Sequence, residues 1–392
     1  MDALMLPLNW QKVRLGDIGK PCMCKRVMKH QTTRYGEIPF YKIGTFGNTA
    51  DAFISKKLFL EYKTKYSFPK KGDILISASG TIGRAVIYDG KPAYFQDSNI
   101  VWIDNDETLV KNDFLFYAYS NVKWNTEHTT ILRLYNDNFR NTLIPLPPLN
   151  EQSAIANILS GLDRYLCALD ALILKKEGVK KALSFELLSQ RKRLKGFNQA
   201  WQKVRLGDIC EFSNGGAYET LIVENGDFKL ISLNSIDIDG NLKNTMKRVN
   251  FYDNSLRQDD IVMVLSDIAH GDFLGLCAVI PSNDYVLNQR MGRLRIRNDC
   301  INILFLRLYI NANQKYFKMQ GQGSSQLNLS KKAIEDFEIL LPPLNEQSAI
   351  ASILSTLDNE ITSLKNKKRQ FENIKKALNH DLMSAKIRVL KK

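Results

Sequence analysis

Side chains that could read the edges of nucleic-acid bases or contact phosphate groups gather in a few short stretches of this chain. Arginine, asparagine and glutamine form paired hydrogen bonds with guanine and adenine, and hydroxyl groups suit phosphate oxygens. In the first half the candidate contacts are Lys25, Arg26, Lys29, Arg34, Tyr35, Ser79, Thr81, Arg84, Thr129, Thr130 and Arg133. In the second half they are Ser266, His270, Asn288, Gln289, Arg290, Arg293, Ser324, Ser325, Gln326 and Asn328. These residue types predict recognition of a nucleic acid rather than bond-making chemistry.

Motifs of a nucleic-acid-modifying enzyme are incomplete in this sequence. Six residues separate Gly83 from Gly90-Lys91, where a P-loop has four, and Gly321-Gln322-Gly323 lacks the third glycine of a dinucleotide fingerprint. The ExK lettering of some nucleases occurs once, at residues 61–63, and has no counterpart in the second half. Cys22 and Cys24 lack a second ligand pair at a zinc-site spacing, and the six scattered cysteines predict reduced thiols. We therefore expect no catalytic residue and no metal site.

Two exact repeats show that the chain is one unit written twice. Residues 10–18 (WQKVRLGDI) recur at 201–209, an offset of 191, and residues 146–156 (LPPLNEQSAIA) recur at 341–351, an offset of 195. At the second offset, residues 128–133 align without a gap with residues 323–328, where small polar residues persist and long polar residues change. What the halves share predicts a scaffold, and what differs predicts what each half reads.

Each half ends in a stretch with the apolar seam of a supercoiling helix. In the first half Ile155, Leu159, Leu162, Leu166, Leu169 and Ile173 alternate steps of four and three. Asn150 and Asn345 follow Pro-Pro-Leu and precede an acidic residue, so we expect them to be N-caps. The first helix should run to about Lys195, and the second can bury its seam only by running back along it. Its roughly 38 residues would make a spacer of about 57 Å.

The expected fold class is α+β, with two mixed α/β globular domains separated by two long antiparallel helices and related by an internal pseudo-two-fold repeat. Short apolar strands are predicted at residues 73–77 and 260–264, with partners at 84–88 and 277–280 beyond Gly/Ser-rich turns. The expected segments are a globular domain at 1–145, a helix at 146–197, a second domain at 198–340 and a second helix at 341–392.

The formal net charge of +14 predicts a polyanionic partner. The four segments carry +6, +4, −1 and +5 in chain order. A generally basic proteome or solvated helix faces would also produce such a balance. No apolar run approaches the roughly 20 residues of a membrane span, and the first residues lack a signal-peptide pattern, so we expect a cytoplasmic protein.

This order of motifs resembles the specificity (S) subunit of type I restriction-modification systems over essentially the whole chain. The resemblance rests on Trp-x-x-Val-x-Leu-Gly-Asp-Ile, a variable stretch, and Leu-Pro-Pro-Leu-x-Glu-Gln leading into a leucine-seamed helix, all repeated once. It implies a non-catalytic subunit whose two target recognition domains each read half of a split double-stranded DNA target. It also implies two docked methyltransferase (modification) subunits and, through them, restriction (motor) subunits. S-adenosylmethionine, ATP and Mg²⁺ would belong to those partners, with no cofactor in this chain.

The identical segments after each Pro-Pro pair are candidate docking sites for identical partners. The residues are Asn150, Glu151, Gln152, Asn345, Glu346 and Gln347. A shared strand-to-helix joint is the alternative explanation for this repeat.

Three rival functions stay open at this level. They are an enzyme that itself methylates or cuts DNA, a coiled-coil scaffold with incidental charge, and the recognition subunit of a related system in which methyltransferase and nuclease are fused. For the expected function, half-sites about one DNA turn apart predict a nonspecific gap of roughly 5 to 8 base pairs.

Overall fold

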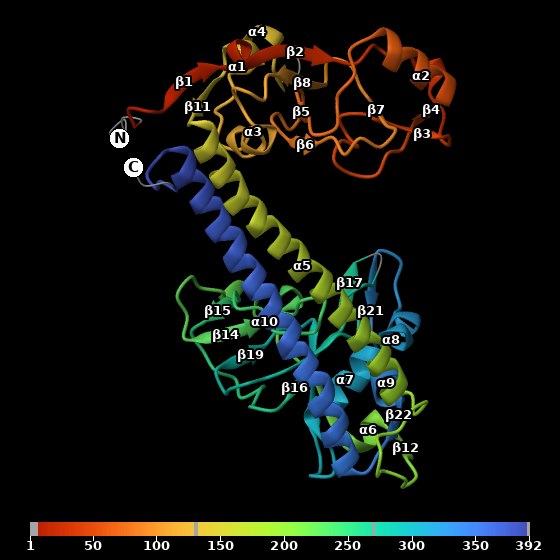
Figure 1. Ribbon diagram of the computed structural model, residues 1–392. Helices are drawn as coiled ribbons and strands as arrows, with labels where there is room; N and C mark the ends of the chain where they lie inside the picture. Colours follow the sequence, from red (N-terminus) through yellow and green to blue (C-terminus); the bar gives the residue numbers. More distant parts are fainter. Residues whose placement is uncertain (1–6, 129–131, 269–270, 390–392) are drawn as a thin grey trace. The chain divides into compact units, whose positions relative to one another are not determined.

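A computed structural model describes residues 7–128, 132–268 and 271–389 and divides into two compact units (Figure 1). The first unit comprises Met1–Asp170 and Asn366–Lys392, and the second comprises Ala171–Lys365. Each unit thus holds one globular domain and part of both long helices. This division differs from the four sequence segments, which separated domains from helices.

The first unit contains eleven strands and five short helices in its described part. The strands are β1 (Gln11–Arg14), β2 (Gly19–Met23), β3 (Ile38–Tyr41), β4 (Phe53–Ile54), β5 (Ile74–Ser77), β6 (Ala85–Ile87), β7 (Tyr94–Phe95), β8 (Ile100–Asn105), β9 (Glu127–His128), β10 (Leu132–Arg133) and β11 (Leu143–Leu146). The helices are α1 (Leu15–Ile18), η1 (Lys29–Gln31), α2 (Lys56–Lys65), α3 (Asn112–Tyr119) and α4 (Asn136–Asn141). A four-stranded antiparallel sheet, β2-β8-β5-β6, forms its centre beside a three-stranded sheet, β4-β3-β7, and the pairs β1-β11 and β9-β10.

The second unit repeats this set of sheets. Its strands are β12 (Gln202–Arg205), β13 (Cys210–Asn214), β14 (Phe228–Ile231), β15 (Lys247–Val249), β16 (Ile261–Val264), β17 (Ser266–Ile268), β18 (Cys277–Val279), β19 (Tyr285–Leu287), β20 (Met291–Ile296), β21 (Gln326–Asn328) and β22 (Glu338–Leu341). Its short helices are α6 (Leu206–Ile209), η2 (Glu219–Leu221), η3 (Leu233–Ser235), α7 (Ile303–Ala312), α8 (Gln314–Gln320) and α9 (Lys331–Glu335). The sheets are β13-β20-β16-β18, β15-β14-β19, β12-β22 and β17-β21. In both units the three-stranded sheet contains one parallel pair, β3 with β7 and β14 with β19.

The central strands β5 and β16 are apolar except at Ser77 because both faces of the sheet are covered. Successive side chains of a strand point to opposite faces. Ile74 and Ile76 pack in the cluster that includes α3, whereas Leu75 packs with β3 and β7 on the other side. Ile261 and Val262 divide in the same way in the second unit. The predicted strands at 73–77 and 260–264 are confirmed, as is their antiparallel pairing with β6 and β18.

The two long helices are α5 (Leu149–Leu188) and α10 (Leu344–Met383), each of 40 residues. Within each unit they run antiparallel, because residues further along α5 form ion pairs with residues earlier in α10. The pairs are Asp163–Lys375 and Asp170–Lys368 in the first unit, and Lys176–Glu360 and Lys180–Asp358 in the second. None of the helices in the described part of the chain combines the length and hydropathy of a membrane span.

Both ends of these helices differ from the sequence prediction. The first helix ends at Leu188 rather than near Lys195. Two residues after this end, Gln190 adopts a left-handed φ of 61°, a conformation that is common just beyond a helix end. The N-cap prediction is wrong, because both helices begin one residue before the asparagine. Asn150 and Asn345 lie in the first turn, and each side-chain oxygen accepts a hydrogen bond from the next residue's amide at 2.9 Å.

A buried glutamate joins each long helix to the opening motif of its unit. The Trp10 indole donates to Glu151 at 3.0 Å, and Arg388 donates to both of its carboxylate oxygens at 2.6 and 2.9 Å. In the second unit Trp201 and Arg193 bond Glu346 in the same way. The exact repeats therefore encode one joint, in which the tryptophan of the first motif meets the glutamate of the second.

The glutamine after this glutamate connects each long helix to a short helix of the same unit, α5 to α3 in the first unit and α10 to α7 in the second. Gln152 accepts from the Lys111 amide at 2.8 Å, and Gln347 accepts from the Asn302 amide at 2.8 Å. The docking prediction for Glu151, Gln152, Glu346 and Gln347 needs correction, because these side chains are at most 2% exposed and fully bonded within the chain. Only the asparagines of the predicted docking set, Asn150 and Asn345, are exposed.

Replacing the buried carboxylate should destabilise the second unit strongly. In Glu346→Gln, an amide would face the donors of Arg193 and Trp201, and the partly buried guanidinium would lose its counter-charge, which costs about 3 kcal/mol. Glu338→Gln is the control, because Glu338 pairs with Lys203 at a side-chain exposure of 54% and should cost less than about 1 kcal/mol. Urea unfolding of the full chain measures both changes. If both variants shifted the urea unfolding midpoint equally, the buried glutamate would not stabilise the second unit in this way.

Candidate nucleic-acid interface

Three separate segments of the first unit meet around Arg133. Ser79 forms an antiparallel bridge with Arg133, and its hydroxyl donates to Asn99 at 2.8 Å. The Arg133 guanidinium donates to the side-chain oxygens of Ser98 and Asn99, each at 3.2 Å. We call Ser79, Asp97, Ser98, Asn99 and Arg133 the first cluster. The sequence predicts Ser79 and Arg133 as separate DNA contacts, and the fold places them side by side.

The equivalent segments of the second unit meet in the same way. Strand β17 pairs with β21 (Figure 1). Ser266 therefore faces Asn328, Ile268 faces Gln326, and the Ser266 hydroxyl donates to Asn328 at 2.6 Å. Residues 266–268 were expected to be part of a turn, and they form a strand because this pairing satisfies their backbone. We call Ser266, the segment 288–290 and the segment 326–328 the second cluster.

Backbone hydrogen bonds show that the two clusters are the same junction. The Ala78 amide donates to Asn99, and the Leu265 amide donates to Arg290, at 2.8 and 3.1 Å. In turn Leu134 donates to Ala78, and Leu329 donates to Leu265, at 2.9 and 2.8 Å. The backbone is thus a common scaffold. Its side chains differ, with Arg133 in the first unit where the second has Asn328.

Sequence reasoning missed the middle segment of the first cluster. Residues 97–99 lie between β7 and β8 and correspond to Asn288, Gln289 and Arg290 between β19 and β20. The two segments are related by the 191-residue offset of the opening repeat, so an alignment at this offset would have identified residues 97–99 from the sequence. Asp97 also holds Arg26 at 2.8 Å, which brings one of the predicted basic residues to the edge of the first cluster.

A hollow of about 410 Å³ adjoins the second cluster. Its lining includes Ser266, Ile268, Arg290 and Gln326 together with Lys243. Ile268 is 76% exposed, although it is a large apolar residue. A two-stranded ribbon can enter the DNA major groove, where glutamine can bond adenine and an apolar side chain can touch the thymine methyl group. The hollow therefore offers cationic, amide and apolar groups in one place, beside the carboxylates of Asp267 and Asp272.

Two of the predicted contacts are committed to bonds inside the second unit. Asn288 is 2% exposed and donates to Glu219 at 2.8 Å, a hydrogen bond that lowers the pKa of the Glu219 carboxyl. Arg293 is 8% exposed and donates to Glu211 at 2.8 Å and to the Ser255 carbonyl at 3.1 Å. Both side chains are therefore bonded within the domain, whereas Gln289 and Arg290 are exposed.

Other predicted residues lie on the surface outside the two clusters. Lys25 stacks its ammonium 5.1 Å from the Tyr66 ring centroid, and Arg84 donates to the Phe46 carbonyl at 3.0 Å. The carbonyl of exposed Thr81 accepts a hydrogen bond from the Ser77 hydroxyl. The remaining exposed candidates are Lys29, Arg34, Tyr35, Ser324 and Ser325. Thr129, Thr130 and His270 lie outside the described residues.

Within residues 7–128, 132–268 and 271–389, no three His, Cys, Asp or Glu side chains gather as a metal site would require. Burial raises the pKa of the Cys24 thiol to about 12, so this thiol stays protonated near neutral pH. The clusters can therefore supply hydrogen-bond donors, acceptors and positive charge to a ligand.

Comparisons with known proteins agree with this arrangement. The family described as type I restriction modification DNA specificity domain matches residues 7–176 and 198–373, one match for each half. A putative type I restriction enzyme specificity subunit from Haemophilus influenzae is 64% identical over 148 residues, which span 38% of each chain. The type I restriction enzyme MjaVIII specificity subunit from Methanocaldococcus jannaschii is 28% identical over 99% of this chain and 95% of its own length.

Solved structures share the fold. The S subunit of a type I restriction-modification system from M. genitalium has a TM-score of 0.65 at 19% identity, covering 97% of this chain and 98% of that one. A chain from a structural study of complex assembly and conformational transition in the type I system has a TM-score of 0.57 at 16% identity, with the same coverage. At these identities the likeness concerns the fold alone.

Proposed function

Because the chain belongs to the type I restriction-modification DNA specificity family, whose specificity subunits are not catalytic, we propose that each of its two clusters reads one half of a bipartite DNA target. The observation that carries this proposal is the shared backbone junction with different side chains. Ser79 and Ser266 keep a buried hydroxyl that donates within its own cluster, whereas Arg133 and Asn328 differ at the facing position. Arginine favours guanine, and asparagine favours adenine.

The partners follow from the same premise. Two methyltransferase subunits bind this chain and connect it to restriction subunits, and they bring S-adenosylmethionine, ATP and Mg²⁺. The complex works in the cytoplasm on double-stranded DNA. Since the repeated glutamate and glutamine are buried, we place docking on the exposed residues beside them. Leu149 and Leu344 are 39% and 44% exposed, and each precedes an exposed asparagine.

Removing one amide from the second cluster should relax one half-site only. Gln326→Ala in the assembled complex should lose about 1–3 kcal/mol of discrimination at one base pair, because a bidentate contact to a base is worth that much. Methylome sequencing, followed by methylation assays on single-base variants of the target, measures this change.

Arg257→Ala is the control for general damage to the second domain. Arg257 is an exposed side chain of the same domain that lies outside the second cluster. This variant should leave both half-sites unchanged. An assembled Gln326→Ala complex with full discrimination at every position would argue against base reading by β21.

A further inference from the structure

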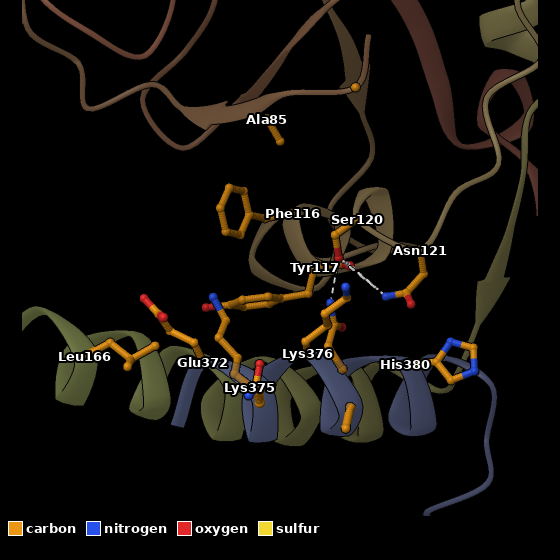
Figure 2. Close-up of a pocket in the computed structure, with 14 residues that line it drawn as sticks. Ala85, Phe116, Tyr117, Ser120, Asn121, Leu166, Glu372, Lys375, Lys376 and His380 are labelled. Carbon is orange, nitrogen blue, oxygen red and sulfur yellow. Dashed lines mark hydrogen bonds between the residues drawn. The ribbon is translucent and has the colours of Figure 1, made fainter. Parts of the chain in front are cut away.

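The first unit contains an open cleft that its function as a DNA reader does not use. The cleft is about 1130 Å³ in volume and lies between the globular domain and α10 (Figure 2). Ala85 from β6 and Phe116 from α3 line one side, and Lys376 and His380 from α10 line the other. None of the residues of the first cluster contributes to its lining.

The second unit fills the equivalent position with its own chain. Helices α3 and α7 start in the same register, since the glutamines of the joints bond the amides of Lys111 and Asn302. Phe116 therefore corresponds to Arg307, five residues further along each helix. The pairing of β5 with β6 and of β16 with β18 likewise matches Ala85 to Cys277.

A tight acidic turn at residues 237–241 covers these equivalent residues. Arg307 donates to the carbonyl of Gly240 at 2.6 Å and to that of Asp239 at 3.2 Å. Gly240 has a φ of 77°, and a Cβ there would lie 2.4 Å from the Asn311 amide nitrogen, so the turn sits directly on α7. The sequence of the turn, Asp-Ile-Asp-Gly-Asn, carries two carboxylates. In the first unit, none of the described residues covers Phe116 and Ala85 in this way, and both line the cleft.

The groups in the cleft indicate what would fill it. Lys375 and Glu372 already have ion-pair partners in the same unit, whereas Lys376 has none among the described residues. An occupant needs an apolar group for Phe116 and a carboxylate for Lys376. A polypeptide with acidic side chains supplies both.

We propose that an acidic segment of one methyltransferase subunit binds in this cleft, at the position that the second unit covers with its own turn. The identity of the partner rests on the proposed function. A DNA backbone fits the cleft less well, because contact with phosphates requires several cations and Lys376 is the single unmatched lysine in the lining. The two methyltransferase subunits are then held unequally, although their sequences are the same, because the second unit covers the equivalent position with its own turn.

Charge reversal at the rim tests this proposal with a matched control. Lys376→Glu in the full-length chain should weaken binding of purified methyltransferase subunits by about tenfold, because it repels the acidic segment. Lys181→Glu makes the same change at the position related by the 195-residue offset, on an exposed site of α5, and should leave binding within about twofold. Titration calorimetry measures both. Equal affinities for the two variants would overturn the proposal.

A photo-crosslinker identifies the occupant directly. Phe116→p-benzoylphenylalanine in the assembled complex should crosslink to a methyltransferase peptide that contains Asp or Glu, identified by mass spectrometry. Crosslinks to DNA, or none, would overturn the cleft assignment. The proposed function has a separate readout, because it fails if the unmodified chain does not assemble with methyltransferase subunits or does not direct methylation to a defined target.

Discussion

Exchange of residues 20–140 for the matching segment of another specificity subunit changes one half of the methylated target and leaves the other half intact. The exchanged segment contains the whole first cluster, from Ser79 to Arg133. The joint lies outside it, because Trp10, Glu151 and Arg388 remain. The incoming domain therefore attaches through the same bonds, among them the backbone amide of residue 111, which donates to Gln152 whatever its side chain.

Methylome sequencing of cells that carry the hybrid reads the result. The reciprocal exchange of residues 211–335 is the matched control, and it should change only the other half of the target. One hydrogen bond depends on the incoming sequence, since the Tyr117 hydroxyl donates to Asp163 at 2.7 Å, so the donor segment should keep this tyrosine. A hybrid that assembles but loses both halves would show that the domains do not read DNA independently.

Lengthening both long helices by one heptad should widen the nonspecific gap of the target by about three base pairs. Seven residues add about 10 Å to a helix, and B-DNA rises 3.4 Å per base pair. The insertions belong after Asp170 in α5 and after Lys365 in α10, where the chain passes between its two compact units. A heptad continues the alternating seam and preserves the ion pairs within each unit, whereas an insertion in one helix alone would shift these pairs out of register.

The control places seven flexible residues after Gly196, in the connection between α5 and β12. This connection lies outside both helices, so the gap should stay as it is. Methylome sequencing gives both the gap and the half-sites. An assembled double-insertion variant that still methylates the original spacing would mean that the helices do not set the gap.

The sequence by itself determined the repeated plan of this protein. The two exact motifs, the alternating seam from Ile155 to Ile173 and the apolar runs at 73–77 and 260–264 predicted a duplicated α+β chain with two long helices. These signals are local, because helices and strands impose periods of 3.6 and 2 on neighbouring residues. Even the candidate contacts Ser79 and Ser266 followed from position, since each lies just beyond a central strand.

Only the tertiary structure decided which groups meet and which face solvent. The repeat around Glu151 suits a docking surface or an internal joint equally well, and its burial against Trp10, 141 residues earlier, identifies the joint. The contribution of residues 97–99 to the first cluster, and the cleft beside Phe116, likewise depend on contacts between distant segments. Such contacts leave no period in the sequence, because they are set by the packing of whole elements rather than by the spacing of adjacent residues.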